Sequence, residues 1–246
     1  MATPRYLPKA PITEALIDFR TPLIAGLGER QLNEIRAAIG AAYPTSEKVY
    51  RFEAKFEHKD GHFVPSTPVD AELGWMFRSA DTLQVAQFRR DGFTFNRLRP
   101  YTAWEDVFPQ AIELWRLFVR VLQPTQIARL AVRFINRLPR VAPASEFGLT
   151  VPPRVPPDLS LQVRSFLNRL VVYEQGHGVS AVVTQAVEDP ADLANPVVLL
   201  DIDAFSEAAV APDEDEVIAK SLGALRALKN EIFFASITEE TARLYE

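Results

Sequence analysis

One stretch near the middle of the chain, Gln126–Leu138, limits the fold more than any other part of the sequence. Its residues alternate in character with a period of two. One face is apolar: Ala128, Leu130, Val132 and Phe134. The other face carries guanidinium groups between apolar side chains: Arg129, Arg133 and Arg137, interleaved with Ile127, Ala131 and Ile135. This alternation predicts a β-strand with one side packed on a core and the other side polar.

The three arginines of this strand recur every fourth residue, so they point to one side, about 13 Å apart in succession. We expect neighbouring strands to bring carboxylates to them, from Glu14 and Asp18 or from Asp201 and Asp203. Two interpretations are open: a solvated sheet face with cross-strand ion pairs, or a shallow groove that recognises an anionic ligand or a partner protein. The candidate binding residues are Arg97, Arg129, Arg133, Arg137, Asp18, Asp201 and Asp203.

Strands and helices are predicted before the central strand from periodicity and turn residues. They are a strand Ile12–Arg20, a helix Glu29–Ala42, strands Lys48–His58 and Glu72–Ser79, a hairpin of Val85–Arg90 and Phe93–Leu98 around Asp91-Gly92, and a helix from Trp104 to Leu122. Thr102 is the predicted N-cap of the last helix, with Glu105 completing a capping box. The apolar stripe of that helix is wide, which predicts that it lies flat on a sheet.

After the central strand the pattern is less regular. The predicted elements are a proline-rich connector Pro139–Pro157, a short helix entering a strand within Leu159–Tyr173, strands Gly178–Val187 and Pro196–Phe205, a helix Glu214–Phe234 capped by Asp213, and a last helical piece within Ile237–Tyr245 with Thr238 as its N-cap. Long amphipathic helices packed on one face of an antiparallel sheet define an α+β fold.

The element order suggests two pseudo-repeated β-α-β-β-β-α halves. We divide the chain into a first α+β half, residues 1–138, a connector, residues 139–157, and a second α+β half, residues 158–246. The alternative is one continuous domain.

Charge and composition limit the partners. The net charge of -5 does not favour nucleic acid or an anionic membrane surface. Cysteine is absent, which excludes disulfides and thiolate metal sites and is typical of a cytoplasmic protein. No run reaches the roughly 18 apolar residues of a membrane span, and the start MATPRYLPKAP has no apolar signal core. We therefore expect a cytoplasmic protein with a protein partner.

No sequence motif for catalysis is found. The glycines form neither a phosphate-binding loop nor a dinucleotide fingerprint, and no G-x-S-x-G elbow occurs. His58, Asp60 and His62 are interpreted as residues of a hairpin turn rather than metal ligands. Asp201 and Asp203 share a strand face, where they could pair with arginines or bind a divalent cation. We assign no cofactor and no catalytic residue, and we keep a metal-dependent hydrolase or nuclease as the alternative function.

Three segments together resemble a known bacterial family. They are LPKAPITEALIDFR (Leu7–Arg20), GFTFNRLRPYTAWEDV (Gly92–Val107) with RLAVRFINRL (Arg129–Leu138), and LRALKNEIFFASIT (Leu225–Thr238). The family is sporadically distributed, its members have about this length, and they have no assigned biochemical function. The resemblance implies one shared architecture and genes linked to mobile or defence elements. It favours a non-enzymatic binding protein of a toxin–antitoxin or phage-defence system, and it assigns no catalytic residue.

Overall fold

The computed structural model describes residues 1–53, 56–59, 62–65, 69–139, 148–151, 156, 161, 163, 165–188 and 197–246. The strands are β1 (Ile12–Arg20), β2 (Thr45–Glu53), β3 (Phe56–Lys59), β4 (His62–Pro65), β5 (Val69–Arg78), β6 (Gln84–Arg89), β7 (Gly92–Leu98), β8 (Arg129–Pro139), β9 (Leu167–Glu174), β10 (Val179–Glu188) and β11 (Val197–Ser206). The helices are α1 (Glu29–Ile39), α2 (Trp104–Leu122), α3 (Asp215–Ser236) and α4 (Glu239–Arg243).

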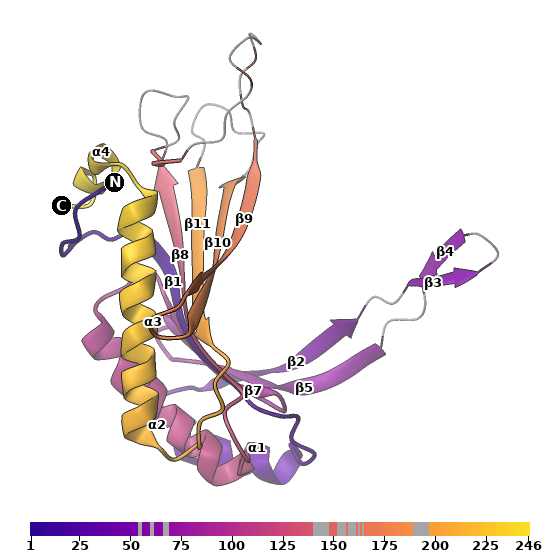
Figure 1. Ribbon diagram of the computed structural model, residues 1–246. Coiled ribbons are helices and arrows are strands. Elements are labelled where there is room, and N and C mark those ends of the chain that lie inside the picture. Colours follow the sequence, from indigo (N-terminus) through magenta and orange to yellow (C-terminus); the bar gives the residue numbers. More distant parts are fainter. Residues whose placement is uncertain are drawn as a thin grey trace.

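A nine-stranded antiparallel sheet organises the described part of the chain, in the order β2-β5-β6-β7-β1-β8-β11-β10-β9 (Figure 1). The predicted α+β class with an antiparallel sheet is therefore confirmed. The central strand β8 pairs with β1 on one side and with β11 on the other, so residues before and after it contribute to the same sheet. Figure 1 shows the sheet bent, with α2 and α3 on the outer side of the bend.

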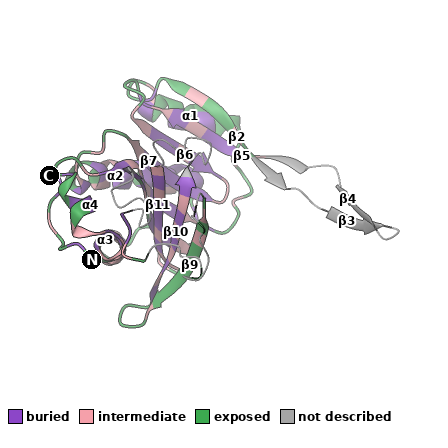
Figure 2. Cartoon of the chain, turned by 90° about the horizontal axis from the view of Figure 1, so that it is seen from above, coloured by how far each residue is buried: buried purple, intermediate pink, exposed green. Residues whose placement is uncertain are grey.

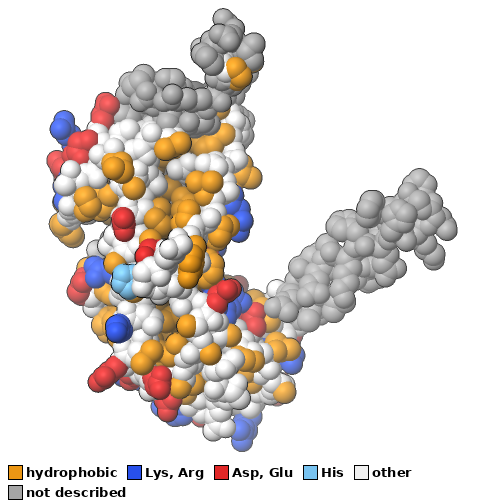
Figure 3. Space-filling view, viewed as in Figure 1, with side chains coloured by type: hydrophobic (Ala, Val, Ile, Leu, Met, Phe, Trp, Pro, Cys, Tyr) orange, Lys and Arg blue, Asp and Glu red, His pale blue; other side chains and the backbone are white. Residues whose placement is uncertain are grey.

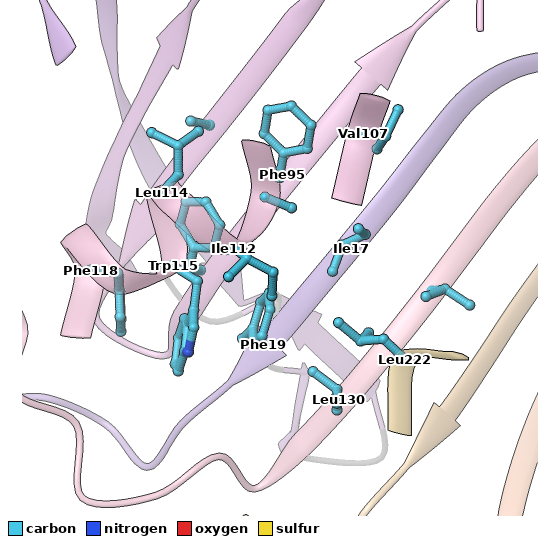
Figure 4. Close-up of a cluster of buried hydrophobic side chains, with 14 of the residues drawn as sticks. Ile17, Phe19, Phe95, Val107, Ile112, Leu114, Trp115, Phe118, Leu130 and Leu222 are labelled. Carbon is cyan, nitrogen blue, oxygen red and sulfur yellow. The ribbon is translucent and has the colours of Figure 1, made fainter. Parts of the chain in front are cut away.

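Aromatic packing between β1 and α2 forms the centre of the core (Figure 4). The ring of Phe19 stacks on Trp115 with centroids 4.3 Å apart, and Phe118 stacks on the other side of the cluster against Trp115 at 5.2 Å. The indole nitrogen of Trp115 donates a hydrogen bond of 3.0 Å to the carbonyl of Pro212. The rings of Phe19, Trp115 and Phe118 are all buried. Their one polar atom, the indole nitrogen, has a hydrogen-bond partner, as a stable core requires.

Helix α3 packs on β8 and β11, on the same face of the sheet that α2 covers. The register explains this, because Phe19 of β1, which contacts α2, lies directly opposite Leu130 of β8. Leu130 belongs with Leu222 and Leu225 of α3 to the same core cluster. The alternation predicted for the central strand thus provides the apolar surface for α3.

Several boundaries of the predicted elements hold. Strand β1 has the predicted bounds, Asp91 lies in the turn between β6 and β7 and Gly92 begins β7, and Thr238 caps α4 by accepting a hydrogen bond of 3.2 Å from the amide of Thr241. The predicted strands Gly178–Val187 and Pro196–Phe205 correspond to β10 and β11.

Two predicted helix caps are wrong. Helix α2 is capped by Ala103, whose backbone is extended and whose carbonyl accepts hydrogen bonds from the amides of Asp106 and Val107. Thr102 therefore lies one residue too early for its side chain to cap the first turn. Helix α3 likewise begins after Glu214 rather than Asp213, and no side chain caps it.

Other predictions are corrected or fall outside the described residues. The predicted helix to Ala42 ends at Ile39, and the predicted strand Lys48–His58 divides into β2 and β3. Strands β3 and β4 pair separately, with Lys59 opposite His62, and Asp60 lies outside the described residues. Of the predicted helix before β9, the described residues 161, 163, 165 and 166 are not helical, and most of the connector 139–157 is outside the described part.

None of the helices in the described ranges combines the length and the apolar character that crossing a membrane requires.

Candidate functional site

The arginines of β8 lie together on the sheet face opposite α2 and α3. Strand β8 has an unbroken register with β11, so Arg129, Arg133 and Arg137 point to one side, as predicted, while Leu130 and Val132 are buried on the other. We call this surface the arginine face. It is formed by Glu14, Asp18, Arg20, Arg89, Asp91, Thr94, Asn96, Arg129, Arg133, Arg137, Asp201 and Asp203.

Two arginines of β8 bind two aspartates of β11. Arg133 lies opposite Asp203 in the register but bonds to Asp201, with its Nε 2.9 Å from Oδ1 and its Nη2 2.5 Å from Oδ2. Arg129 extends over the ring of Phe205, 4.4 Å from its centroid, and its Nη2 donates a 2.7 Å hydrogen bond to Asp203. Both pairs are the cross-strand ion pairs that the sequence predicted.

A second cluster connects β1 with the β6–β7 hairpin. Asp18 accepts hydrogen bonds from Arg20 (2.9 Å), Arg89 (3.2 Å) and the hydroxyl of Thr94 (2.5 Å). Asp91, in the turn of the hairpin, accepts hydrogen bonds from Arg20 (2.8 Å) and Arg89 (3.0 Å). The two carboxylates and two guanidinium groups therefore form a closed, four-membered ionic cluster.

The two clusters meet at a long contact between Nη1 of Arg129 and Oδ2 of Asp18, at 3.6 Å. Burial alone would raise the pKa of Asp18, but the charges of Arg20 and Arg89 and the hydroxyl of Thr94 outweigh it and lower that pKa. For Asp203 burial prevails over the charge of Arg129, and its pKa is raised. The Asp18 cluster is thus fixed in its charged form.

Exposure changes from one end of the arginine face to the other. The side chain of Arg89 is only 6% exposed, whereas that of Arg133 is 45% exposed. Arg137 lies further along β8 and is also exposed. The buried end is therefore structural, and the end with Arg133 and Arg137 is the part that another molecule can reach.

Charges on this face balance. Arg20, Arg89, Arg129 and Arg133 are paired with Asp18, Asp91, Asp201 and Asp203. Each of these four guanidinium groups already has a carboxylate partner, so this part of the face lacks the excess positive potential of a site for free anions. Its geometry instead offers ordered donors and acceptors side by side.

One predicted site residue, Arg97, is not brought to this face. It lies opposite Ala15 and Gln84, and Ala15 is buried on the helix side of the sheet. Its Nε donates to the carbonyl of Pro100 at 3.3 Å. The other six predicted site residues, Arg129, Arg133, Arg137, Asp18, Asp201 and Asp203, lie on the arginine face.

Sequence reasoning missed Arg89, Asp91 and Thr94. Alternation within β6 places Gln87 and Arg89 on one face, and Arg89 donates to the carbonyl oxygen of the Gln87 amide at 3.0 Å. That pattern could have drawn attention to Arg89, but Asp18, which connects it to β1, lies 71 residues away in the sequence.

The carboxylates of Asp201 and Asp203 share a face, as predicted for a metal site. Both are bonded to arginine, and a cation would have to displace those guanidinium groups. Across the described residues no group of three or more His, Cys, Asp or Glu side chains is arranged to bind a metal ion.

A further ionisable group lies on the helix side of the sheet. Lys229 of α3 is 7% exposed, and its Nζ lies 3.8 Å from the centroid of the Phe134 ring. Burial lowers the pKa of Lys229 to about 7, and the nearby charge of Arg226 adds to this effect. The buried face of α3 thus includes one lysine.

Comparison of the sequence with models of protein families gives no match, and comparison with characterised proteins gives none either.

Proposed function

We propose that this chain is a non-enzymatic binding protein that recognises a protein partner through the exposed end of the arginine face. The observation that supports the proposal is that Arg133 is both held in place by an aspartate and exposed. Its Nε and Nη2 are fixed by Asp201, yet the side chain is 45% exposed. A guanidinium group fixed in this way loses little conformational entropy when a partner binds its remaining donors.

Balanced charge favours a polypeptide over a small anion as the ligand. A peptide presents both carbonyl acceptors and amide donors, which match alternating carboxylates and guanidinium groups. A free anion would meet Asp201 and Asp203 at the same place as the arginines. We extend the proposal to a toxin–antitoxin or phage-defence system, because the family that the sequence resembles has a sporadic distribution.

The experiment compares two arginine variants in a pull-down from cells of the native host. Arg133→Ala removes the exposed guanidinium group from the arginine face. Arg116→Ala is the matched control, because Arg116 is an exposed, carboxylate-paired arginine on α2. We expect a partner that wild type and Arg116→Ala retain and that Arg133→Ala binds at least about tenfold more weakly, a change of about 1.4 kcal/mol. Equal retention by both variants would contradict the proposal.

A small anionic ligand is the other outcome that this face allows. Titration of the purified protein with inorganic phosphate, followed by thermal unfolding, separates the two cases. Stabilisation by phosphate that Arg133→Ala abolishes would replace the protein partner with an anionic ligand.

We keep metal-dependent hydrolysis through Asp201 and Asp203 as the alternative function, supported by their common strand face and by the raised pKa of Asp203. It requires Arg129 and Arg133 to leave their carboxylates. Thermal unfolding with and without Mn²⁺ tests it: a shift in wild type that is absent in Asp201→Asn supports a metal site, and the lack of any shift removes this alternative.

We also propose that the two halves of the sheet are pseudo-repeats. From the centre outwards the strands run β1-β7-β6-β5-β2 on one side and β8-β11-β10-β9 on the other. In each half the first strand is central, the last strand lies beside it, and a long helix follows. Superposition of the strand sets is the test: α2 must then fall on α3.

A further inference from the structure

The outermost strand β9 exposes an unusual amount of apolar side chain. Figure 2 shows it as an exposed strand at the border of the molecule, and in Figure 3 hydrophobic side chains gather over the region of β9 and β10. The exposed residues are Leu167, Leu170, Val171, Val172 and Tyr173. They alternate along the strand, so both faces of β9 are apolar. A patch of this kind marks an interaction surface.

Among the described strands, β9 has a hydrogen-bonded neighbour on one side only. Its inner edge pairs with β10, and no strand in the described ranges pairs with its outer edge. Helix α3 packs on β8 and β11 and only touches β10, so it does not cover β9. An apolar edge strand with free amides and carbonyls is a template for pairing with another strand.

The opposite edge of the sheet is different. Strand β2 carries Glu47 and Lys48 on successive, opposite-facing positions, and both are exposed. Charges of this kind discourage strands from pairing edge to edge. Within Leu167–Glu174 there is neither a lysine nor a proline. Of the two edge strands of this sheet, β9 carries fewer charged residues than β2 and is the better candidate for association.

We propose that β9 pairs with β9 of a second copy of this chain, antiparallel, around a two-fold axis at Val171. In this register Val171 faces Val171 of the second copy, and Leu170 faces Val172 of the second copy. Arg169 faces Tyr173 of the second copy, where its guanidinium group can lie over the ring. Asn168 faces Glu174 of the second copy, an amide donor against a carboxylate.

This register is the self-complementary one. A two-fold axis normal to the sheet has to pass through a residue position, because an axis between two residues would pair side chains from opposite faces. Neighbouring allowed registers therefore differ by two residues. Centring on Val172 would set the carboxylate of Glu174 against Leu170, and centring on Leu170 would set Asn168 against Val172. The register at Val171 sets Leu170, Val171 and Val172 against apolar residues and Asn168 against Glu174, with no like charges opposed.

This interface goes beyond the proposed function, because it uses a different surface. Arg169, Val171 and Tyr173 lie on the same side of the sheet as the arginine face, since β10 pairs Val182 with both Val171 and Asp203. Pairing at β9 would therefore join the arginine faces of two copies into one continuous surface.

Sedimentation velocity over about 1 to 100 µM protein tests the proposal, a range that brackets a micromolar dissociation constant. Val171→Lys places two ammonium groups opposite each other at the two-fold axis. Val217→Lys is the matched control, since Val217 is 43% exposed on α3, away from the sheet edge. We expect wild type and Val217→Lys to dimerise alike and Val171→Lys to dimerise at least about tenfold more weakly. A wild-type monomer at all concentrations, or equal dimerisation of the two variants, overturns the proposal.

A second pair of variants tests the register itself. Asn168→Arg sets a positive charge against Glu174 of the second copy, and Asn168→Glu sets a negative one there. Both lose the same 3.3 Å hydrogen bond to Gln185, so their stabilities are matched in this respect. Tighter dimerisation of Asn168→Arg than of Asn168→Glu, by about fivefold or more, supports the register. Equal dimerisation constants, or the reverse order, would exclude it.

Discussion

Replacing the buried lysine of α3 with methionine should stabilise the protein most at acidic pH. Lys229 keeps its ordinary pKa of 10.5 in the unfolded chain, whereas burial in the folded chain lowers the pKa to about 7. Between about pH 7 and pH 10.5, Lys229 binds fewer protons in the folded chain than in the unfolded chain. The free energy of unfolding therefore rises with pH in that window. Below about pH 7, Lys229 is protonated in both the folded and the unfolded chain, and the full cost of burying its charge lowers the stability.

The size of this stabilisation follows from the two pKa values of Lys229 and from its contact with the Phe134 ring. One pKa unit corresponds to about 1.4 kcal/mol, so the full penalty is about 5 kcal/mol, of which about 2.5 kcal/mol disappears between about pH 6 and pH 9. The attraction between the ammonium group and the Phe134 ring opposes this, by about 2 kcal/mol when desolvated. We therefore expect the advantage of Lys229→Met to be larger at about pH 6 than at about pH 9 by about 1 to 2.5 kcal/mol.

Urea unfolding of wild type and Lys229→Met at both pH values measures this difference. Methionine keeps a similar volume, so the packing on Phe134 changes little. Lys220→Met is the control, because Lys220 is an exposed lysine of the same helix and should give the same effect at both pH values. If the effect of Lys229→Met is independent of pH, the lysine keeps its ordinary pKa and the reasoning fails.

Three further substitutions test the packing and the ionic cluster, each by urea unfolding. Asp18→Asn should cost about 3 kcal/mol, because Arg89 is buried beside it; the deficit should be full above about pH 4 and shrink below it, since the pKa of Asp18 is lowered. Gly92→Ala should cost about 2 kcal/mol or more, because φ is +141° and a Cβ would lie 2.0 Å from the carbonyl oxygen of Phe19. Trp115→Ala should cost about 3 to 5 kcal/mol through the lost stack. A cost below about 0.5 kcal/mol for any of them would contradict its argument.

Local signals in the sequence were sufficient for most of the elements and for part of the candidate site. Polar and apolar residues alternate regularly along β1 and β8, and Asp91-Gly92 indicates the hairpin between β6 and β7. The pairing of Arg129 and Arg133 with β11 followed because aspartates two residues apart on a strand share a face.

Long-range register was not available from the sequence, and this accounts for the errors at the site. A shift of one residue moves a side chain to the other face of a sheet, and the register of β7 on β1 places Arg97 with Ala15 on the helix side. Arg89 was missed for a related reason, because its partner Asp18 belongs to a distant strand. The wrong cap of α2 is a local error of one residue, which the extended backbone of Ala103 explains.

The narrow link between the two ionic clusters has a consequence for folding order. Asp18, Arg20, Arg89 and Asp91 neutralise one another within residues 18–91, and Arg129 and Arg133 find their acids in β11. A contact of 3.6 Å between Arg129 and Asp18 joins them. Each side of the β1–β8 seam can thus complete its charge pairing before the seam closes. We expect two separately cooperative units, which native-state hydrogen exchange would detect as two sets of amides with different opening free energies.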